Sequence, residues 1–138
     1  MASEAQFLNR SLEELDVRQV TVADGTQISK GSLLVLSSDP NTATKHSAES
    51  QVPLGITTTE KVANDGATVV GVLVRGDVDM VAEVAITLGH LVIPGATANQ
   101  VIGIPSESIS NSTLRFILGQ CLETASAGER VRIRLRLG

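Results

Sequence analysis

The stretch Arg130-Val-Arg-Ile-Arg-Leu-Arg-Leu137 decides the fold class, because charged and aliphatic residues alternate along it without a break. A period of two is typical of a β-strand, in which successive side chains point to opposite faces. The aliphatic residues should therefore share one face that packs on a core. The opposite face should carry four arginines: Arg130, Arg132, Arg134 and Arg136.

Similar strand signals recur from Val17 onward, where short runs of Val, Ile, Leu and Thr are separated by clusters of turn residues. β-branched residues fit a pleated sheet, and Gly, Asp, Asn, Pro and Ser interrupt it. Many short strands at this spacing predict an all-β fold, either a small β-barrel or a β-sandwich. The expected strands are 17–22, 32–37, 52–58, 67–75, 77–83, 90–93, 100–104, 114–122 and 130–137.

Three landmarks occur in the same order in both halves of the chain, which predicts two duplicated halves. Ile28-Ser-Lys-Gly31 resembles Ile86-Thr-Leu-Gly89, and a Leu-Gly pair follows each of them. Two such halves can close a sheet and so remove exposed strand edges. The repeated glycines are Gly31 and Gly89, Gly55 and Gly119, and Gly66 and Gly128.

Residues 1–16 are expected to form an extended N-terminal arm ahead of a β-domain at 17–138. Ser11 and Glu14 fit a capping box at the start of one short helix. Residues 1–10 show no strand pattern, so we expect an arm that is ordered by a partner, or simple fraying of the terminus. The sequence has neither the pattern of a secretory signal nor an apolar run near the roughly 20 residues of a membrane span.

The sequence contains no recognisable catalytic or metal-ligating pattern, so we expect no enzyme activity and no cofactor. His46, in a polar loop, and His90 lack a second histidine or cysteine at ligand spacing. The single cysteine, Cys121, excludes an internal disulfide and fits a small buried side chain. Arg75-Gly76-Asp77 spells a tripeptide known from cell adhesion, but its strand-like flanks indicate a hairpin turn or a strand kink.

The four arginines of the last strand need a partner, and nucleic acid is disfavoured. The net charge is −4, and the only aromatic residues are two Phe, whereas nucleic-acid-binding proteins usually present a broad basic surface. Asp77 and Asp79 would share one face of a strand, and could pair with the arginines if the two strands are neighbours. The same arginines could instead meet acidic groups of another chain, since arginine is enriched at interfaces.

The ending Leu118-Gly-Gln-Cys-Leu-Glu-Thr-Ala, followed by Gly128-Glu-Arg-Val-Arg-Ile-Arg-Leu, resembles that of capsid decoration (cement) proteins of tailed double-stranded DNA bacteriophages. The stretches around Gly31 and Gly89 and the segment 70–78 resemble other strands of that family. The likeness covers roughly residues 17–137. The chain departs from the family pattern at three positions, which are Ser32, His90 and Val92.

The resemblance implies a non-enzymatic virion protein on the outer capsid surface, assembled in the host cytoplasm. Its partners would be the major capsid protein, whose subunits it would hold together, and further copies of itself in a dimer or trimer, without nucleic acid or membrane. The alternative is a ligand- or carbohydrate-binding β-domain of a phage tail or host-adhesion module. Candidate interface residues are Phe7, Leu8, Arg10, Asp77, Asp79, Arg130, Arg132, Arg134 and Arg136.

Overall fold

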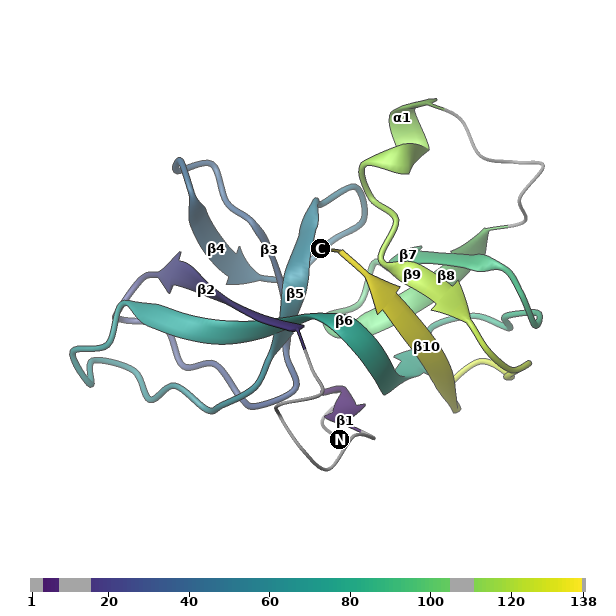
Figure 1. Cartoon of the computed structure of the whole chain (residues 1–138), viewed down its shortest axis with the longest axis horizontal. Helices are drawn as coiled ribbons and strands as arrows, with labels where there is room; N and C mark the ends of the chain where they lie inside the picture. Colours follow the sequence, from purple (N-terminus) through teal and green to yellow (C-terminus); the bar gives the residue numbers. More distant parts are fainter. Residues whose placement is uncertain (1–3, 8–15, 105–110, 138) are drawn as a thin grey trace.

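The computed structural model describes residues 4–7, 16–104 and 111–137, and within them the chain is all-β, as the sequence predicts (Figure 1). Ten strands belong to one partly ringed sheet, and one helical turn stands apart from it. In chain order the elements are β1 (Gln6–Phe7), β2 (Asp16–Val22), β3 (Leu33–Leu36), β4 (Thr42–Lys45), β5 (Pro53–Thr57), β6 (Val69–Ala82), β7 (Leu91–Pro94), β8 (Gln100–Ile104), α1 (Asn111–Leu114), β9 (Gly119–Cys121) and β10 (Arg130–Arg136).

The sheet consists of two rings of strands that meet along β6. The first part of β6 pairs with β2 and β5, and β2, β4, β3 and β5 pair in that order. The second part of β6 pairs with β8 and β10, and β8, β7, β9 and β10 pair in that order. We call residues 16–75 the first half and residues 76–137 the second half. Figure 1 shows the two halves lying side by side, with β6 running through both.

The two halves follow one structural plan, so the predicted duplication is present in the fold. Two backbone hydrogen bonds of 2.9 and 2.7 Å join Ile28 and Lys61, and two of 2.9 and 3.0 Å join Ile86 and Ala125. Two of the three repeated glycine pairs adopt the same left-handed backbone conformation, which residues with a side chain rarely adopt. Their φ angles are 86° and 87° for Gly31 and Gly89, and 86° and 84° for Gly66 and Gly128.

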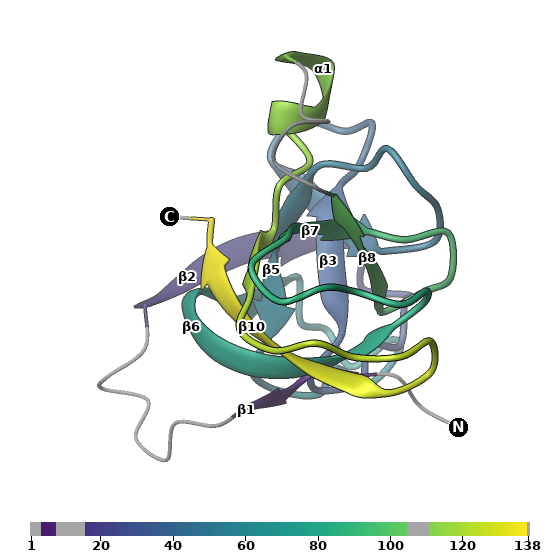
Figure 2. The same cartoon turned by 90° about the vertical axis from the view of Figure 1, so that its right-hand side faces the viewer.

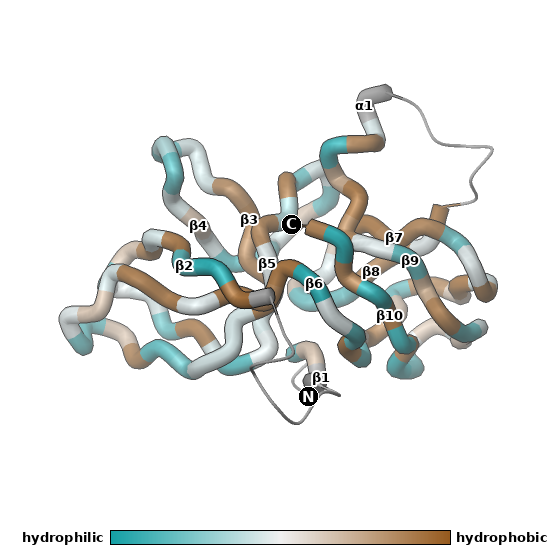
Figure 3. The backbone as a smooth tube through the Cα atoms, viewed as in Figure 1, coloured by the Kyte–Doolittle hydropathy of each residue, from teal (hydrophilic) through white to brown (hydrophobic). Residues whose placement is uncertain are grey.

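Apolar side chains fill each half and also join the two halves. In Figure 3, hydrophilic and hydrophobic residues alternate along β10, as expected for a strand with one buried face. The first half has its own core of Val22, Ile28, Leu34, Ala43, Val70, Val72 and Val74. The core of the second half also includes four first-half residues that are fully buried: Leu33, Val35, Ile56 and Leu73.

Three of the predicted strands are wrong in their extent. The segments 67–75 and 77–83 are not two strands, because β6 runs through them as one strand of 14 residues. Gly76, with a φ of 137°, kinks this strand without reversing the chain, so the strand-kink interpretation of Arg75-Gly76-Asp77 is correct. The predicted strand 114–122 is shorter than expected, because α1 and a turn precede β9.

Strand β4 is absent from the predicted strands, since its sequence Thr-Ala-Thr-Lys looks like a polar loop. Ala43 is nevertheless buried, while Thr44 and Lys45 are exposed. Ala43 is thus the one buried residue of this strand, and a small side chain among polar neighbours gives no hydrophobic signal.

Residues 4–7 of the expected N-terminal arm pack against the body of the protein. β1 pairs antiparallel with β6, with Gln6 opposite Asp79 and Phe7 opposite Val78 (Figure 2). Ala5 is buried, with 6% of its surface exposed. Leu8, Arg10 and most of the expected helix at 11–16 lie outside the described residues. Within the described part of the chain, no helix has the length and apolar character of a membrane span.

Candidate functional site

The candidate site is the outer face of β10 and the second part of β6, which we call the arginine face. It comprises the four arginines of β10 together with Asp77 and Asp79. β10 lies antiparallel to β6, so that Arg132 is opposite Asp79 and Arg134 is opposite Asp77. The residues between the arginines point the other way and are at most 1% exposed: Val131, Ile133 and Leu135. Burial of these aliphatic side chains fixes the arginines on the exterior, as the alternation predicts.

Two arginines of this face form ion pairs within the chain, which answers a question that the sequence left open. Arg134 donates from Nε to Oδ1 of Asp77 at 3.0 Å and from Nη2 to Oδ2 at 3.4 Å. This forked contact raises the pKa of Arg134, first through the hydrogen bond and then through the charge of Asp77. Nε of Arg132 lies 3.5 Å from Oδ1 of Asp79. Half-exposed pairs of this kind add little to stability.

Arg130 connects the arginine face to the N-terminal residues. Its Nη1 donates to the backbone oxygen of Glu4 at 2.9 Å and to that of Asp79 at 3.4 Å. The same segment continues into β1, which pairs with β6. Phe7 therefore lies next to the arginine face through its backbone, and three separate segments of the chain meet there.

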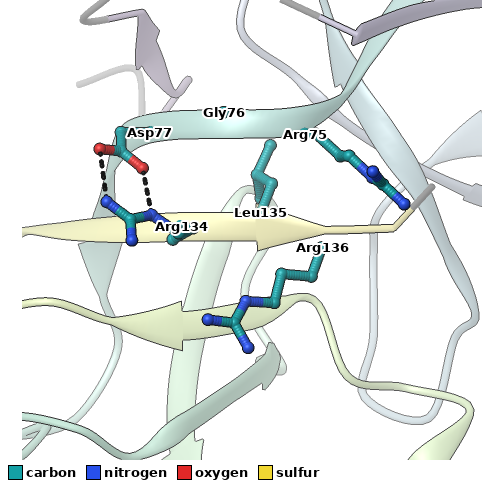
Figure 4. Close-up of a pocket in the computed structure, with 6 residues that line it drawn as sticks. All are labelled: Arg75, Gly76, Asp77, Arg134, Leu135 and Arg136. Atoms are coloured by element: carbon teal, nitrogen blue, oxygen red, sulfur yellow. Dashed lines mark hydrogen bonds and ion pairs between the residues drawn. The ribbon is translucent and has the colours of Figure 1, made fainter.

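An open groove of about 420 Å³ lies at one end of the face, where β6 is kinked (Figure 4). There Arg136 is opposite Arg75, so two like charges occupy neighbouring strands. Figure 4 shows these two side chains pointing away from each other, whereas Arg134 points toward Asp77. In the part of the chain that the structure describes, Arg136 has no acidic partner. The groove is lined by Arg75, Gly76, Asp77, Arg134, Leu135 and Arg136.

The sequence predicted most of this face but not the groove. Arg75 belongs to it only because β6 is continuous through Gly76 and β10 pairs along both sides of the kink. A comparison of the halves gives a further signal. The positions equivalent to Arg134 and Asp77 in the first half are Leu73 and Val17, which are opposite each other in the same way. The pairing of Arg134 with Asp77 is thus specific to the second half.

His46 and Cys121, whose side chains are of types often used in catalysis or metal binding, have structural roles here. Nδ1 of His46 accepts the N–H of Asn99 at 3.0 Å, so the ring proton is on Nε2, which donates to the oxygen of Gly95 at 2.7 Å. His46 is 1% exposed and links the two halves. The thiol of Cys121 is buried 2.9 Å from the oxygen of Thr87. Among residues 4–7, 16–104 and 111–137, no three His, Cys, Asp or Glu side chains gather as a metal site would require.

Lys61 is a buried charged residue whose burial the sequence did not predict. Lys61 is 2% exposed, and its Nζ donates to the backbone oxygen of Asp24 at 2.8 Å and to Oδ1 of Asp65 at 2.9 Å. Burial by itself lowers the pKa of Lys61, but the hydrogen bonds and charges of Asp65 and Asp24 outweigh it, so that the pKa is raised. All its donors are directed at turns of the first half, which makes it a structural ion rather than a catalytic amine.

Comparison with known proteins gives a match in structure but not in sequence. No family model matches the chain, and no curated protein matches it. The crystal structure of the N base of the head fiber gp8.5 in bacteriophage phi29 has a similar fold, with a TM-score of 0.54 and 15% sequence identity. The match covers 90% of this chain and 96% of that one. At this identity the similarity concerns the fold.

Proposed function

We propose that this protein is a structural component of a tailed-phage virion and binds the outside of the assembled head through protein–protein contacts. The observation that carries the proposal is the match to the base of a phage head fiber, over 90% of this chain and 96% of that base. Because the match extends over both halves, it concerns a complete architecture and not a common hairpin or ring. Fold similarity alone leaves function open, so the surface chemistry has to agree with it.

The chemistry of the described residues supports binding. The ring nitrogens of His46 are both used in hydrogen bonds, and the thiol of Cys121 is buried. The arginine face, by contrast, points outward: the side chains of Arg132 and Arg134 are 49% and 52% exposed. A binding surface needs exposed polar groups on a rigid support, and the paired strands β10 and β6 provide that support.

The arginine face suits contact with another protein. A guanidinium has five N–H donors, and Arg134 uses two of them on Asp77. The remaining donors are available to a partner, and the aspartate limits the number of conformations that the arginine can adopt before binding. In the finer form of the proposal, the partner is the major capsid protein, and copies of this protein hold neighbouring subunits together. A repeating lattice makes many weak contacts sufficient.

The proposal is tested with heads of the source phage that lack this protein. Purified protein should co-sediment with expanded heads in a saturable manner, and cryo-electron microscopy should place it on the outer surface. Heads carrying the protein should also rupture at a higher temperature than bare heads. Failure to bind heads at micromolar protein concentration would contradict the proposal, and clear hits on a glycan array without head binding would favour the alternative of a carbohydrate-binding module.

A further inference from the structure

We propose that the groove beside Gly76 recognises carboxylates on an acidic segment of a partner protein, with Arg136 as the recognising group. The inference rests on the proposed function in one respect, namely that the partner is a protein of the head surface. The groove itself is argued from the register of β10 and β6, the space beside them and the distribution of charge.

The register leaves Arg136 without a carboxylate opposite it. β10 has an arginine at every second position. In β6, Asp79 is opposite Arg132 and Asp77 is opposite Arg134. At the next position in the series, Arg136 is opposite Arg75. Each of the two preceding arginines has its carboxylate at 3.0 to 3.5 Å. Arg136, at the edge of the groove, has none in the part of the chain that the structure describes.

The two arginines occupy equivalent positions of the repeat. Leu73 in β6 and Arg134 in β10 are equivalent by register. Arg75 and Arg136 lie two residues further along the same strands, so they are equivalent too. Their side chains diverge in Figure 4, and Arg75 is also opposite Asp16 of β2. A carboxylate in the groove could be held by forked hydrogen bonds to Arg136.

The groove has room for such a group. Its volume is about 420 Å³, and both Arg136 and Leu135 line it. Gly76 contributes no side chain, and its φ of 137° excludes most replacements that would fill the space. An aspartate or glutamate side chain on an extended segment could therefore reach Arg136 without any movement of the strands.

Charge favours a short acidic segment of a protein over a nucleic acid. The chain as a whole carries a net charge of −4, and Asp77 lines the same groove. A polynucleotide would carry its regularly spaced phosphates past this aspartate, whereas a single carboxylate needs only the end of the groove. The test must therefore distinguish binding of nucleic acid from binding of an acidic peptide.

The first test uses a hexaglutamate peptide as the probe and follows arginine Nε–Hε signals by NMR at low salt. We expect the Arg136 signal to shift on titration, and the Arg134 signal, already engaged by Asp77, to shift less. Arg136→Gln should weaken binding at least tenfold and Arg136→Lys by less, because lysine keeps the charge but not the fork. Lys45→Gln, an equal charge change on exposed β4, is the matched control and should stay within twofold of the wild type.

Three results would overturn the inference. They are no shift at the highest soluble peptide concentration, equal binding of hexaglutamine, or tighter binding of a six-nucleotide single-stranded DNA than of hexaglutamate. Misfolding is excluded by the melting temperature of Arg136→Gln, which should not fall, since Arg136 has no acidic partner in the part of the chain that the structure describes.

Head binding separates this inference from the proposed function. If the wild type binds heads and Arg136→Gln binds them equally well, the groove is not the recognition site, although the proposed function stands. If the wild type binds no heads but hexaglutamate shifts Arg136, the site stands and the proposed function fails. We expect Arg136→Gln to bind heads at least tenfold more weakly, with a smaller dependence on salt.

Discussion

The repeat allows one substitution to be compared at two equivalent positions, Gly31→Ala and Gly89→Ala. Both glycines have nearly the same φ, 86° and 87°, so alanine costs about 1–2 kcal/mol at either position because the left-handed region disfavours a side chain. The surroundings differ. A Cβ at Gly89 would meet nothing within 4 Å, whereas a Cβ at Gly31 would collide with the backbone of Ala5.

The difference between the two variants therefore reports on the docking of residues 4–7. To relieve the collision, the segment must move away, which breaks the hydrogen bond from the N–H of Ala5 to Gly31 and the one from Arg130 to Glu4. Each such bond contributes about 0.5–1.5 kcal/mol. We expect Gly31→Ala to destabilise the protein by about 1–3 kcal/mol more than Gly89→Ala.

Urea unfolding measures this difference, and amide hydrogen exchange locates it. In Gly31→Ala the amides of Ala5, Gln6 and Phe7 should exchange faster, while those of the core of the second half should not. Gly89→Ala is the matched control and should leave the amides of 5–7 protected. Equal destabilisation by the two substitutions, or unchanged protection of these amides in Gly31→Ala, would refute the reasoning.

Four further predictions concern Lys61, Asp65, His46 and Cys121. Lys61→Met should lower the melting temperature in calorimetry, because the carboxylates of Asp24 and Asp65 lose their shared cation; an unchanged value would contradict the structural role. The N–H of Ala67 and then Lys61 lower the pKa of Asp65 from 3.8 to about 2, so its contribution to stability is complete above about pH 4 and lost as the pH falls toward 2. Urea unfolding between pH 5 and 2 should show this loss, and less of it in Lys61→Met. His46→Ala should cost about 2–4 kcal/mol, since two backbone groups lose their partners; a loss below about 1 kcal/mol would argue against the link between the halves. The Cys121 thiol should react with Ellman's reagent only as fast as the protein opens, and rapid reaction of the native protein would contradict its burial.

The fold class and the repeat could be predicted from the sequence because both depend on local patterns. The alternation of residues 130–137 specifies a strand with one buried face, and glycines in a left-handed conformation leave a visible spacing. The continuity of β6 could not be predicted, since a kinked strand and a hairpin turn both place glycine between two apolar runs. Burial of Lys61 was equally hidden, because only the tertiary fold brings Asp24 and Asp65 around it.

The candidate site was predicted in part for the same reason. The pairing of Asp77 and Asp79 with arginines follows from two alternating strands, once they are neighbours. Arg75 was missed because its place opposite Arg136 depends on register across the kink. The roles proposed for Leu8 and Arg10 remain predictions, since these residues lie outside the described part of the chain.

The burial of one first-half face against the second half has an evolutionary consequence. A unit of one half alone, about 60 residues by the spacing of Ile28 and Ile86, would leave Leu33, Val35, Ile56 and Leu73 in water. Such an ancestor would need a second copy to cover that surface. Fusion of two genes would supply the cover permanently within one polypeptide. The descendant second copy would then be released from this constraint, and arginine could replace leucine at the position of Arg134.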